Sequence, residues 1–294
     1  MFAGVFTALI TPFKDNRIDA EALRRLVEQQ IAHGIAGLVP CGTTGESATL
    51  SHAEHKEVIR LCVEAVAGRV KVIAGAGSNA TSETIELTRF AKEAGADAAL
   101  LITPYYNKPG QEGLYRHYRA VAESVDLPLV LYNVPSRTGV DLLPDTVARL
   151  ARELPGIVAV KEATANMERV SVIRSLCGEN PILLSGDDAT FLPFLAVGGR
   201  GVISVSSNID PARMVGIWRA WQDGKRDLAL SIHEQLLDLN RQLFCETNPI
   251  PVKGVAAMLG FCQPEIRLPL TWLNEKNQVN LRRIVQRLGL LSGD

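Results

Sequence analysis

Lys161 ends an otherwise apolar run, residues 156–160, whose composition is typical of a buried strand. Lysine is seldom placed in a sheet core, because burying an ammonium group without a partner is costly. A low-dielectric site lowers the pKa of the amine, so that part of it is a free nucleophile near neutral pH. Such an amine condenses with a carbonyl compound to a Schiff base, which then acts as an electron sink. The alternative interpretation is a lysine at a strand end that extends its ammonium into water.

Other reactive side chains follow other apolar runs. Residues 42–47, Gly-Thr-Thr-Gly-Glu-Ser, form a candidate tight turn whose backbone N–H groups and threonine hydroxyls can bind the carboxylate of a keto acid. Tyr132 is a candidate acid/base for proton transfers between carbinolamine and imine, and Arg137 offers a planar fork for a second carboxylate. Each has a plainer interpretation as a simple turn, a strand tyrosine with a satisfied hydroxyl, or a solvated loop charge.

A fold is needed that brings these side chains together. Short aliphatic runs alternate with amphipathic helical segments, and the runs are continuously apolar, which predicts parallel strands buried on both faces. The expected strands are residues 5–10, 37–41, 70–75, 98–103, 128–134, 157–161, 182–185 and 202–205. The expected helices begin near Asp19, Ser51, Thr81, Gln111, Pro144, Asn166, Ala189 and Pro211. Residues 51–54 and 81–84 place Ser or Thr ahead of an acid, as a capping box does.

Eight strand-then-helix units predict an α/β fold, a closed (β/α)8 barrel over residues 1–224, with a doubly wound open sheet as the alternative. Residues 225–294 are expected to form a C-terminal helical extension packed on the barrel, with helices near 226–243, 251–259 and 281–290. The active site of such a barrel lies at the carboxyl ends of its strands. The candidate side chains all fall at such ends, which favours function over the plainer interpretation of each.

Composition argues against several classes of partner. The 294 residues carry a formal net charge of −1 without basic blocks, so neither nucleic acid nor an anionic membrane surface is an expected partner. No apolar stretch reaches transmembrane length, and the N-terminus lacks the pattern of a signal or transit peptide. Five cysteines, an odd number without C-x-x-C spacing, are typical of reduced thiols. We therefore expect a cytoplasmic protein.

Two short patterns suggest other chemistry. Residues 75–80 match the G-x-G-x-x-A pattern of dinucleotide folds, but they lie in the third of eight equivalent units. His52 and His55 lie about one turn apart, as zinc ligands can, but their spacing is neither H-E-x-x-H nor H-x-x-E-H and no third ligand is evident. Polar first turns of helices explain both patterns, so we expect neither a metal nor an organic cofactor.

Six segments of the chain strongly resemble the dihydrodipicolinate synthase family. This family is part of the pyruvate-dependent class I aldolases and lyases, to which N-acetylneuraminate lyase is also related. The matching segments are residues 42–50, 132–139, 161–164, 185–188, 201–204 and 248–253. The resemblance extends over essentially the whole chain.

The resemblance implies a role for each matching residue. Lys161 would form the imine with pyruvate, and Tyr132 would be the general acid/base above it. Thr43 and Tyr106 would complete a proton relay with Tyr132, Tyr106 being contributed across a dimer interface. The residues implied to bind substrates are Thr44 and Ile203 for pyruvate, and Arg137 and Gly186 for L-aspartate-4-semialdehyde.

The implied reaction is condensation of these two substrates to 4-hydroxy-tetrahydrodipicolinate, the first committed step of diaminopimelate and lysine biosynthesis. It needs no metal or organic cofactor. The family's usual assembly is a homotetramer made as a dimer of tight dimers. Members sensitive to L-lysine bind it at the tight-dimer interface through residue types that match Ser47, Ala48, His52, His55, Asn79, Glu83 and Tyr105.

Two other functions stay open at this point. The first is the same imine chemistry on another aldehyde, as in N-acetylneuraminate lyase or a keto-deoxy-sugar-acid aldolase. Arg137 discriminates between them, because a short carboxylate-bearing aldehyde needs a cation whereas a sugar chain needs neutral hydrogen-bonding groups. The second is a barrel that binds a keto acid and lysine as a sensor without catalysis. The reactive set of Lys161, Tyr132, Thr43 and Tyr106 argues against a sensor, since binding alone needs no buried amine.

Overall fold

The protein is built on one closed parallel sheet. The computed structural model describes residues 2–291, and within them eight parallel strands follow the order β1-β10-β9-β8-β7-β6-β5-β4. These strands are β1 Gly4–Ala8, β4 Gly37–Val39, β5 Lys71–Gly75, β6 Ala98–Ile102, β7 Leu129–Asn133, β8 Ile157–Glu162, β9 Ile182–Ser185 and β10 Gly201–Ser204. Each overlaps an expected strand. The (β/α)8 barrel is confirmed, and the open doubly wound alternative is wrong because the strand order closes on itself.

A helix follows each strand, as expected. The helices that alternate with the strands are α1 Ala20–Ala32, α2 His52–Val66, α3 Thr81–Glu93, α4 Gln111–Ser124, α6 Pro144–Glu153, α7 Met167–Cys177, α8 Phe191–Ala196 and α9 Pro211–Gln222. Short elements that the apolar pattern did not predict are the hairpin β2 Phe13–Lys14 and β3 Arg17–Ile18, the turns η1 Ser47–Thr49 and η2 Ser206–Asn208, and helix α5 Pro135–Thr138. None of the helices in the described residues is both long and apolar enough to span a membrane.

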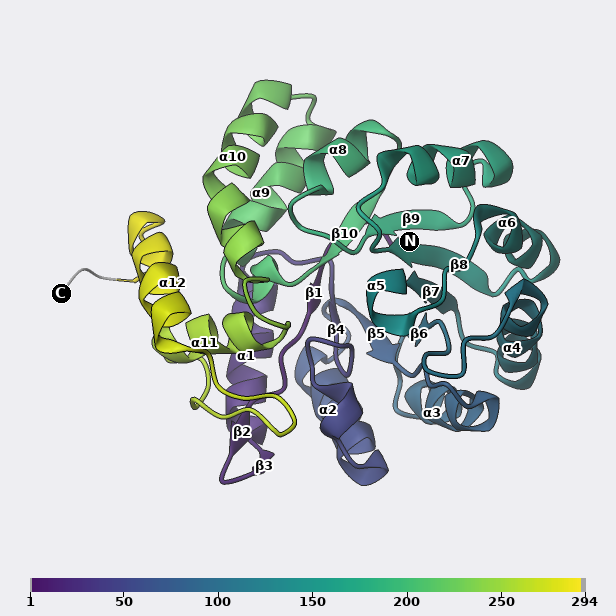
Figure 1. Ribbon diagram of the computed structural model, residues 1–294, viewed down its shortest axis with the longest axis horizontal. Coiled ribbons are helices and arrows are strands. Elements are labelled where there is room, and N and C mark those ends of the chain that lie inside the picture. Colours follow the sequence, from purple (N-terminus) through teal and green to yellow (C-terminus); the bar gives the residue numbers. More distant parts are fainter. Residues whose placement is uncertain (1, 292–294) are drawn as a thin grey trace. The chain divides into compact units, whose positions relative to one another are not determined.

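Tertiary contacts divide the chain into two compact units. Unit 1 comprises Lys71–Ile203 together with the first described residues up to Gly4. In it β5, β6, β7, β8 and β9 pair in succession, and the helices pack in chain order as α3 with α4, α4 with α6, and α6 with α7 (Figure 1). All five residues of β7 are buried, because neighbouring strands flank it and helices cover the sheet. Unit 1 therefore holds the successive barrel strands β5 to β9 with their helical cover.

Unit 2 comprises Val5–Val70 and the described residues from Ser204 onward. In it β1 pairs with β4, α1 packs on α2, and α9 packs on α10. The C-terminal helices within the described residues are α10 Arg226–Gln242, α11 Ile250–Met258 and α12 Glu275–Arg287. Helix α12 begins six residues earlier than expected, because Asn274 caps it by accepting from the N–H of Asn277. The boundary of the extension at residue 225 stays a prediction.

Of the two expected capping boxes, one forms and one does not. Ser51 accepts from the N–H of Glu54, whose carboxylate accepts in return from the N–H of Ser51. The second expectation is wrong, because Ala80 occupies the cap position of α3 and makes no side-chain bond. The hydroxyl of Thr84 instead accepts from the N–H of Ser78 at 3.0 Å and closes the turn that precedes the helix.

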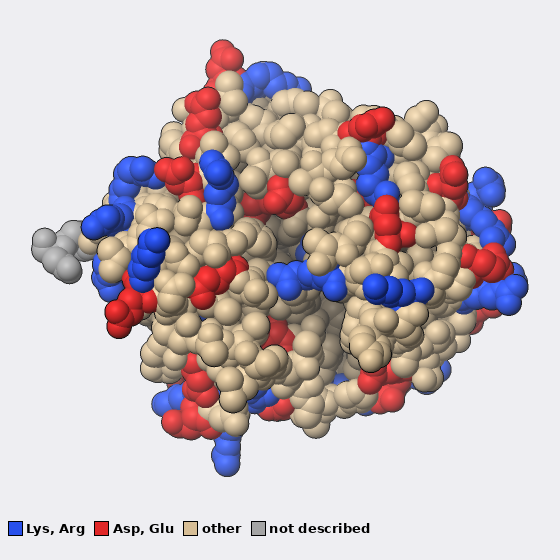
Figure 2. Space-filling view, in the orientation of Figure 1, with Lys and Arg blue, Asp and Glu red and all other residues tan. Residues whose placement is uncertain are grey.

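Acidic and basic side chains are interspersed over the face shown in Figure 2. The chain has 31 Lys and Arg against 32 Asp and Glu, so the two signs are nearly balanced in number. Such a surface provides no broad field of one sign to steer a polyanion.

Candidate active site

The candidate nucleophile and acid/base lie together in unit 1. Tyr132 and Lys161 are direct register partners on β7 and β8, so their side chains share one face of the sheet. The Nζ of Lys161 lies 4.2 Å from the ring centroid of Tyr132, and each residue is 6% exposed. Within residues 2–291, Lys161 has no carboxylate at ion-pair distance. A buried amine held against a phenol ring is the arrangement that imine chemistry needs.

Two further expected residues lie in unit 1, and one of them, Gly186, lies against Lys161. Gly186 follows β9, and a Cβ added to it would lie 3.2 Å from Cε of Lys161 and 2.5 Å from Cβ of Ala163. The backbone of Gly186 therefore runs along the lysine side chain, and any larger residue would collide with Ala163. Ile203 is buried on β10, where its neighbour Val202 pairs with Ser185 of β9.

A buried ionic network fastens the opposite face of the same strands. Asn133 and Glu162 are the next register pair after Tyr132 and Lys161, so their side chains point the other way. The carboxylate of Glu162 accepts from Nε of Arg169 at 2.7 Å and from Nδ2 of Asn133 at 3.3 Å. The sequence analysis missed this network. The available signal was Glu162 itself, because it lies two residues after the buried Val160 and so faces the same side of the strand. It holds the ends of β7 and β8 in register beside the reactive pair.

The candidate carboxylate-binding cation lies on the short helix α5. Arg137 is exposed there. The helix is held by Thr138, whose hydroxyl donates to the carbonyl of Val140 at 2.9 Å. Gly139 ends the helix at φ +69°, and a Cβ added to it would lie 2.9 Å from Cε of Lys108. A second cation therefore crosses the helix two residues beyond Arg137.

Tyr106 does not join the buried pair within one chain. It is 90% exposed and has φ +71°, an uncommon value for a residue with a side chain. The neighbouring Asn107 donates from Nδ2 to the carbonyl of Asn79 at 2.8 Å and fixes this loop to the turn before α3.

The glycine-flanked turn after β4 belongs to unit 2. The N–H of Gly45 donates to the carbonyl of Gly42, and that of Glu46 donates to the carbonyl of Thr43, each at 3.1 Å. The turn thus uses these two N–H groups internally, and the expectation that its remaining N–H groups bind an anion stays a prediction. Thr44 is 3% exposed, and its Oγ1 accepts from Nδ2 of Asn248 at 3.0 Å. The hydroxyls of Thr43 and Thr44 stay the expected side-chain donors for an anion.

The same turn contains a buried ion pair that sequence reasoning missed. Nζ of Lys253 lies 2.5 Å from Oε1 of Glu46, and the two side chains are 0% and 1% exposed. Oε2 of Glu46 accepts from the N–H of Arg267 at 3.1 Å. Burial lowers the pKa of the Lys253 ammonium, and the Glu46 carboxylate acts in the opposite direction. Lys161 and Lys253 are the buried lysines among residues 2–291, and a carboxylate partner distinguishes Lys253 from Lys161.

The expected lysine-binding residues divide between the two units. In unit 1, Asn79 and Glu83 flank the start of α3, where Glu83 accepts from the hydroxyl of Ser78. Tyr105 is 39% exposed. It lies two residues before Asn107, whose side chain donates a hydrogen bond to the carbonyl of Asn79. The members in unit 2 are Ser47 and Ala48 of η1 and His52 and His55 of α2.

The two weak patterns have structural explanations. A Cβ added to Gly77 would lie 2.4 Å from the backbone nitrogen of Ile102, so the second glycine of residues 75–80 is needed for contact with β6. No cluster of three or more His, Cys, Asp or Glu among the described residues is arranged to hold a metal.

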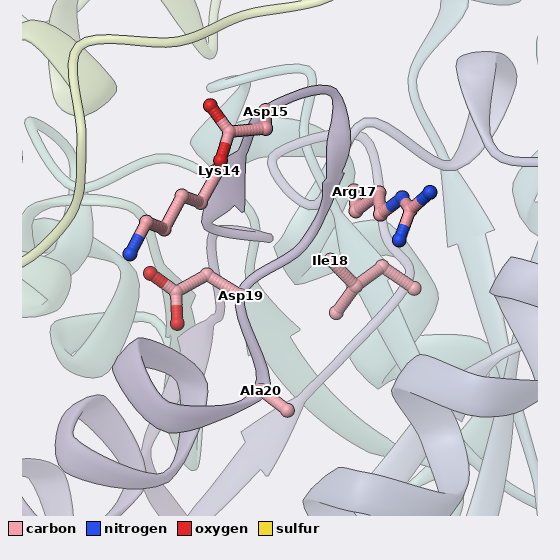
Figure 3. A pocket seen from close by; sticks show the side chains of 6 residues that line it. All are labelled: Lys14, Asp15, Arg17, Ile18, Asp19 and Ala20. Atoms are coloured by element: carbon pink, nitrogen blue, oxygen red, sulfur yellow. The ribbon is translucent and has the colours of Figure 1, made fainter.

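An open hollow at the β2–β3 hairpin is lined by charges of both signs (Figure 3). One of them, Asp19, caps α1 by accepting from the N–H of Ala22.

Known proteins resemble the chain along its whole length. The model of the dihydrodipicolinate synthetase family matches residues 1–288. A 4-hydroxy-tetrahydrodipicolinate synthase of Magnetococcus marinus is 61% identical over 291 residues, 99% of each chain. The structure of the chloride-inhibited dihydrodipicolinate synthase of Acinetobacter baumannii complexed with pyruvate is 44% identical at a TM-score of 0.97, over 99% of this chain and 100% of that one. The lysine-bound enzyme of Cyanidioschyzon merolae is 41% identical at a TM-score of 0.96, over 99% of each chain. On this agreement of sequence and fold, the chain belongs to the dihydrodipicolinate synthetase family.

Proposed function

We propose that this chain condenses pyruvate with L-aspartate-4-semialdehyde through an imine on Lys161 and so forms 4-hydroxy-tetrahydrodipicolinate. The observation that carries the proposal is the buried Lys161 amine, 4.2 Å from the ring centroid of Tyr132 and without a carboxylate partner among residues 2–291. Full-length relatives named for this reaction support it. The experiment that tests the reaction is a product assay in which pyruvate is offered with the semialdehyde and, separately, with N-acetylmannosamine.

The reaction balances through groups already described. The amine of Lys161 attacks C2 of pyruvate, and the carbinolamine loses water to give the imine. Loss of a proton from C3 gives the enamine, whose C3 bonds to the aldehyde carbon. The substrate's own amine then attacks the imine carbon, closes the ring and releases Lys161. Tyr132 is placed to carry protons in these steps, with Thr43 and Tyr106 as its relay.

Replacing Tyr132 with phenylalanine is expected to lower kcat by roughly 10²- to 10⁴-fold, because the ring stays while the proton carrier is lost. The KM for pyruvate should change by less than about threefold, since the phenol is assigned to proton transfer rather than to binding. Steady-state kinetics with both substrates measure the two effects. Tyr115→Phe on α4, whose hydroxyl bonds Glu153, is the matched control and should keep kcat. An unchanged kcat in Tyr132→Phe would remove the acid/base role.

Arg137 is assigned to the carboxylate of the semialdehyde. In Arg137→Leu we expect kcat/KM for the aldehyde to fall roughly 10- to 100-fold, the value of a charge-assisted hydrogen bond. Imine formation with pyruvate alone should be unchanged. Arg152→Leu, an exposed arginine on α6, is the control. Equal kcat/KM in wild type and Arg137→Leu, or efficient use of N-acetylmannosamine by the wild type, would favour the sugar-acid aldolase alternative.

The assembly and the binding of lysine are part of the proposal. We assign a homotetramer built as a dimer of dimers, in which Tyr106 serves the neighbouring copy. Its 90% exposure supports this role, because it leaves the phenol accessible to a neighbouring copy. A cytoplasmic location stays a prediction.

L-lysine is expected to inhibit the initial rate, with the expected lysine-binding residues as its site. The lysine-bound structure of the Cyanidioschyzon merolae enzyme supports this regulation. In Glu83→Gln the carboxylate that would pair with the effector's ammonium is lost, so the inhibitory concentration should rise roughly tenfold or more. Glu93→Gln at the other end of α3 is the control. A flat response of the wild type to added lysine would remove the claim.

A further inference from the structure

The C-terminal extension reaches Thr44 of the glycine-flanked turn through a side-chain hydrogen bond. Nδ2 of Asn248 donates to Oγ1 of Thr44 at 3.0 Å, across 204 residues of sequence. The two residues are 5% and 3% exposed, so bulk water does not compete freely for this bond. No role in the reaction follows for Asn248 from the resemblance.

The direction of this bond determines what the Thr44 hydroxyl can do. A hydroxyl has one hydrogen to donate and two lone pairs that accept. Because the amide N–H of Asn248 occupies a lone pair of Thr44, the hydroxyl hydrogen must point elsewhere. A donor that is itself polarised by an incoming hydrogen bond binds an anion more strongly. Thr44 is thereby set as a donor, which is the role required to bind a carboxylate.

Asn248 is itself held firmly in unit 2. It lies two residues before the start of α11, and the pair of Lys253 with Glu46 fastens that helix to the same turn two residues beyond Thr44. Glu46 has φ +55°, a conformation that a residue with a side chain keeps only where its surroundings impose it. The turn is thus held at Thr44 and at Glu46 by two residues of the extension.

From these contacts we propose that Asn248 is a positioning residue for the carboxylate of the keto-acid substrate, acting by fixing the Thr44 hydroxyl as a hydrogen-bond donor. The inference rests on the proposed function, in which Thr44 binds pyruvate. It gives the C-terminal extension a part in substrate selection.

Asn248→Asp tests the proposal, because it keeps the size of the side chain and replaces the donor with an acceptor. The Thr44 hydroxyl would then donate to the new carboxylate and turn away from substrate. The pyruvate concentration for half-maximal borohydride trapping of Lys161, and the KM for pyruvate, should each rise roughly 10- to 100-fold. The kcat at saturating pyruvate and the KM for the aldehyde should stay within about threefold. A merely structural defect would instead change all of these constants together.

Four further variants complete the experiment. They are Asn248→Ala, Thr44→Val, and the double variants that combine Thr44→Val with Asn248→Asp or with Asn248→Ala. In the Thr44→Val background, substitution of Asn248 should have no further effect on pyruvate binding, because the hydroxyl that it orients is gone. Asn280→Asp, an exposed position on α12, is the control. If the wild type is trapped by pyruvate but both Asn248 variants bind it normally, or if their effects add to that of Thr44→Val, this inference is overturned and the imine stands. If the wild type is not trapped at all, the proposed function falls as well. Should Asn248→Asp fail to fold, the same comparison is made with Asn248→Ala, Thr44→Val and their double variant.

Discussion

Lys161→Arg is expected to lower the rate of condensation by about 10⁴-fold or more. Arginine has nearly the same length and keeps the positive charge, but its guanidinium is always protonated and is no nucleophile. Because burying a guanidinium without a partner is itself costly, folding is checked separately. The measurement is kcat/KM for pyruvate with the semialdehyde in excess, together with circular dichroism as a check of folding.

The matched control for this variant is Lys71→Arg, on β5 of the same unit. Lys71 is a half-exposed lysine paired with Asp97, and arginine preserves such a surface pair. Its activity should equal that of the wild type within about twofold. Comparable activity in Lys161→Arg and Lys71→Arg would contradict the assignment of Lys161 as the nucleophile.

Lys253→Met is expected to cost about 3–5 kcal/mol of the free energy of unfolding, because it leaves the Glu46 carboxylate buried without its cation. Glu46→Gln should cost less, since a neutral amide can still accept from Lys253. The double variant Glu46→Leu/Lys253→Met should recover most of the loss, because an apolar pair of similar volume needs no desolvation of charge. Urea unfolding followed by circular dichroism measures the three values.

Lys225→Met is the surface comparison for this experiment. Lys225 pairs with Asp223, and both side chains are more than half exposed, so the loss should stay below about 1 kcal/mol. If Lys253→Met loses no more than Lys225→Met, the buried pair does not fasten the extension to the turn.

The barrel was predictable because its strands are continuous apolar runs of short, regular spacing. The reactive types at strand ends were equally visible, and the register pairing of Tyr132 with Lys161 brings two of them together. Local sequence patterns could not predict which distant side chains bond to the residues of the turn after β4. Asn248 reaches Thr44 over 204 residues, and Lys253 reaches Glu46 over 207, so neither pairing leaves a periodic signal.

A capping-box prediction was wrong because another hydrogen bond close by in the sequence uses the same side chain. Residues 81–84 suggested a cap, but Thr84 bonds Ser78 and closes the preceding turn instead. Burial of a lysine does not by itself identify a reactive amine, because Lys253 is more buried than Lys161. The discriminating feature is the carboxylate partner, which only the three-dimensional structure reveals.

The most direct measurement is covalent trapping of the wild-type protein with pyruvate and borohydride, followed by peptide mass analysis. Reduction of the imine leaves a stable secondary amine on the lysine that carried it. We expect a single adduct per chain, on the peptide that contains Lys161, and none when pyruvate is omitted. An adduct on the peptide of Lys253 or of any other lysine, or no pyruvate-dependent adduct, would contradict the central claim.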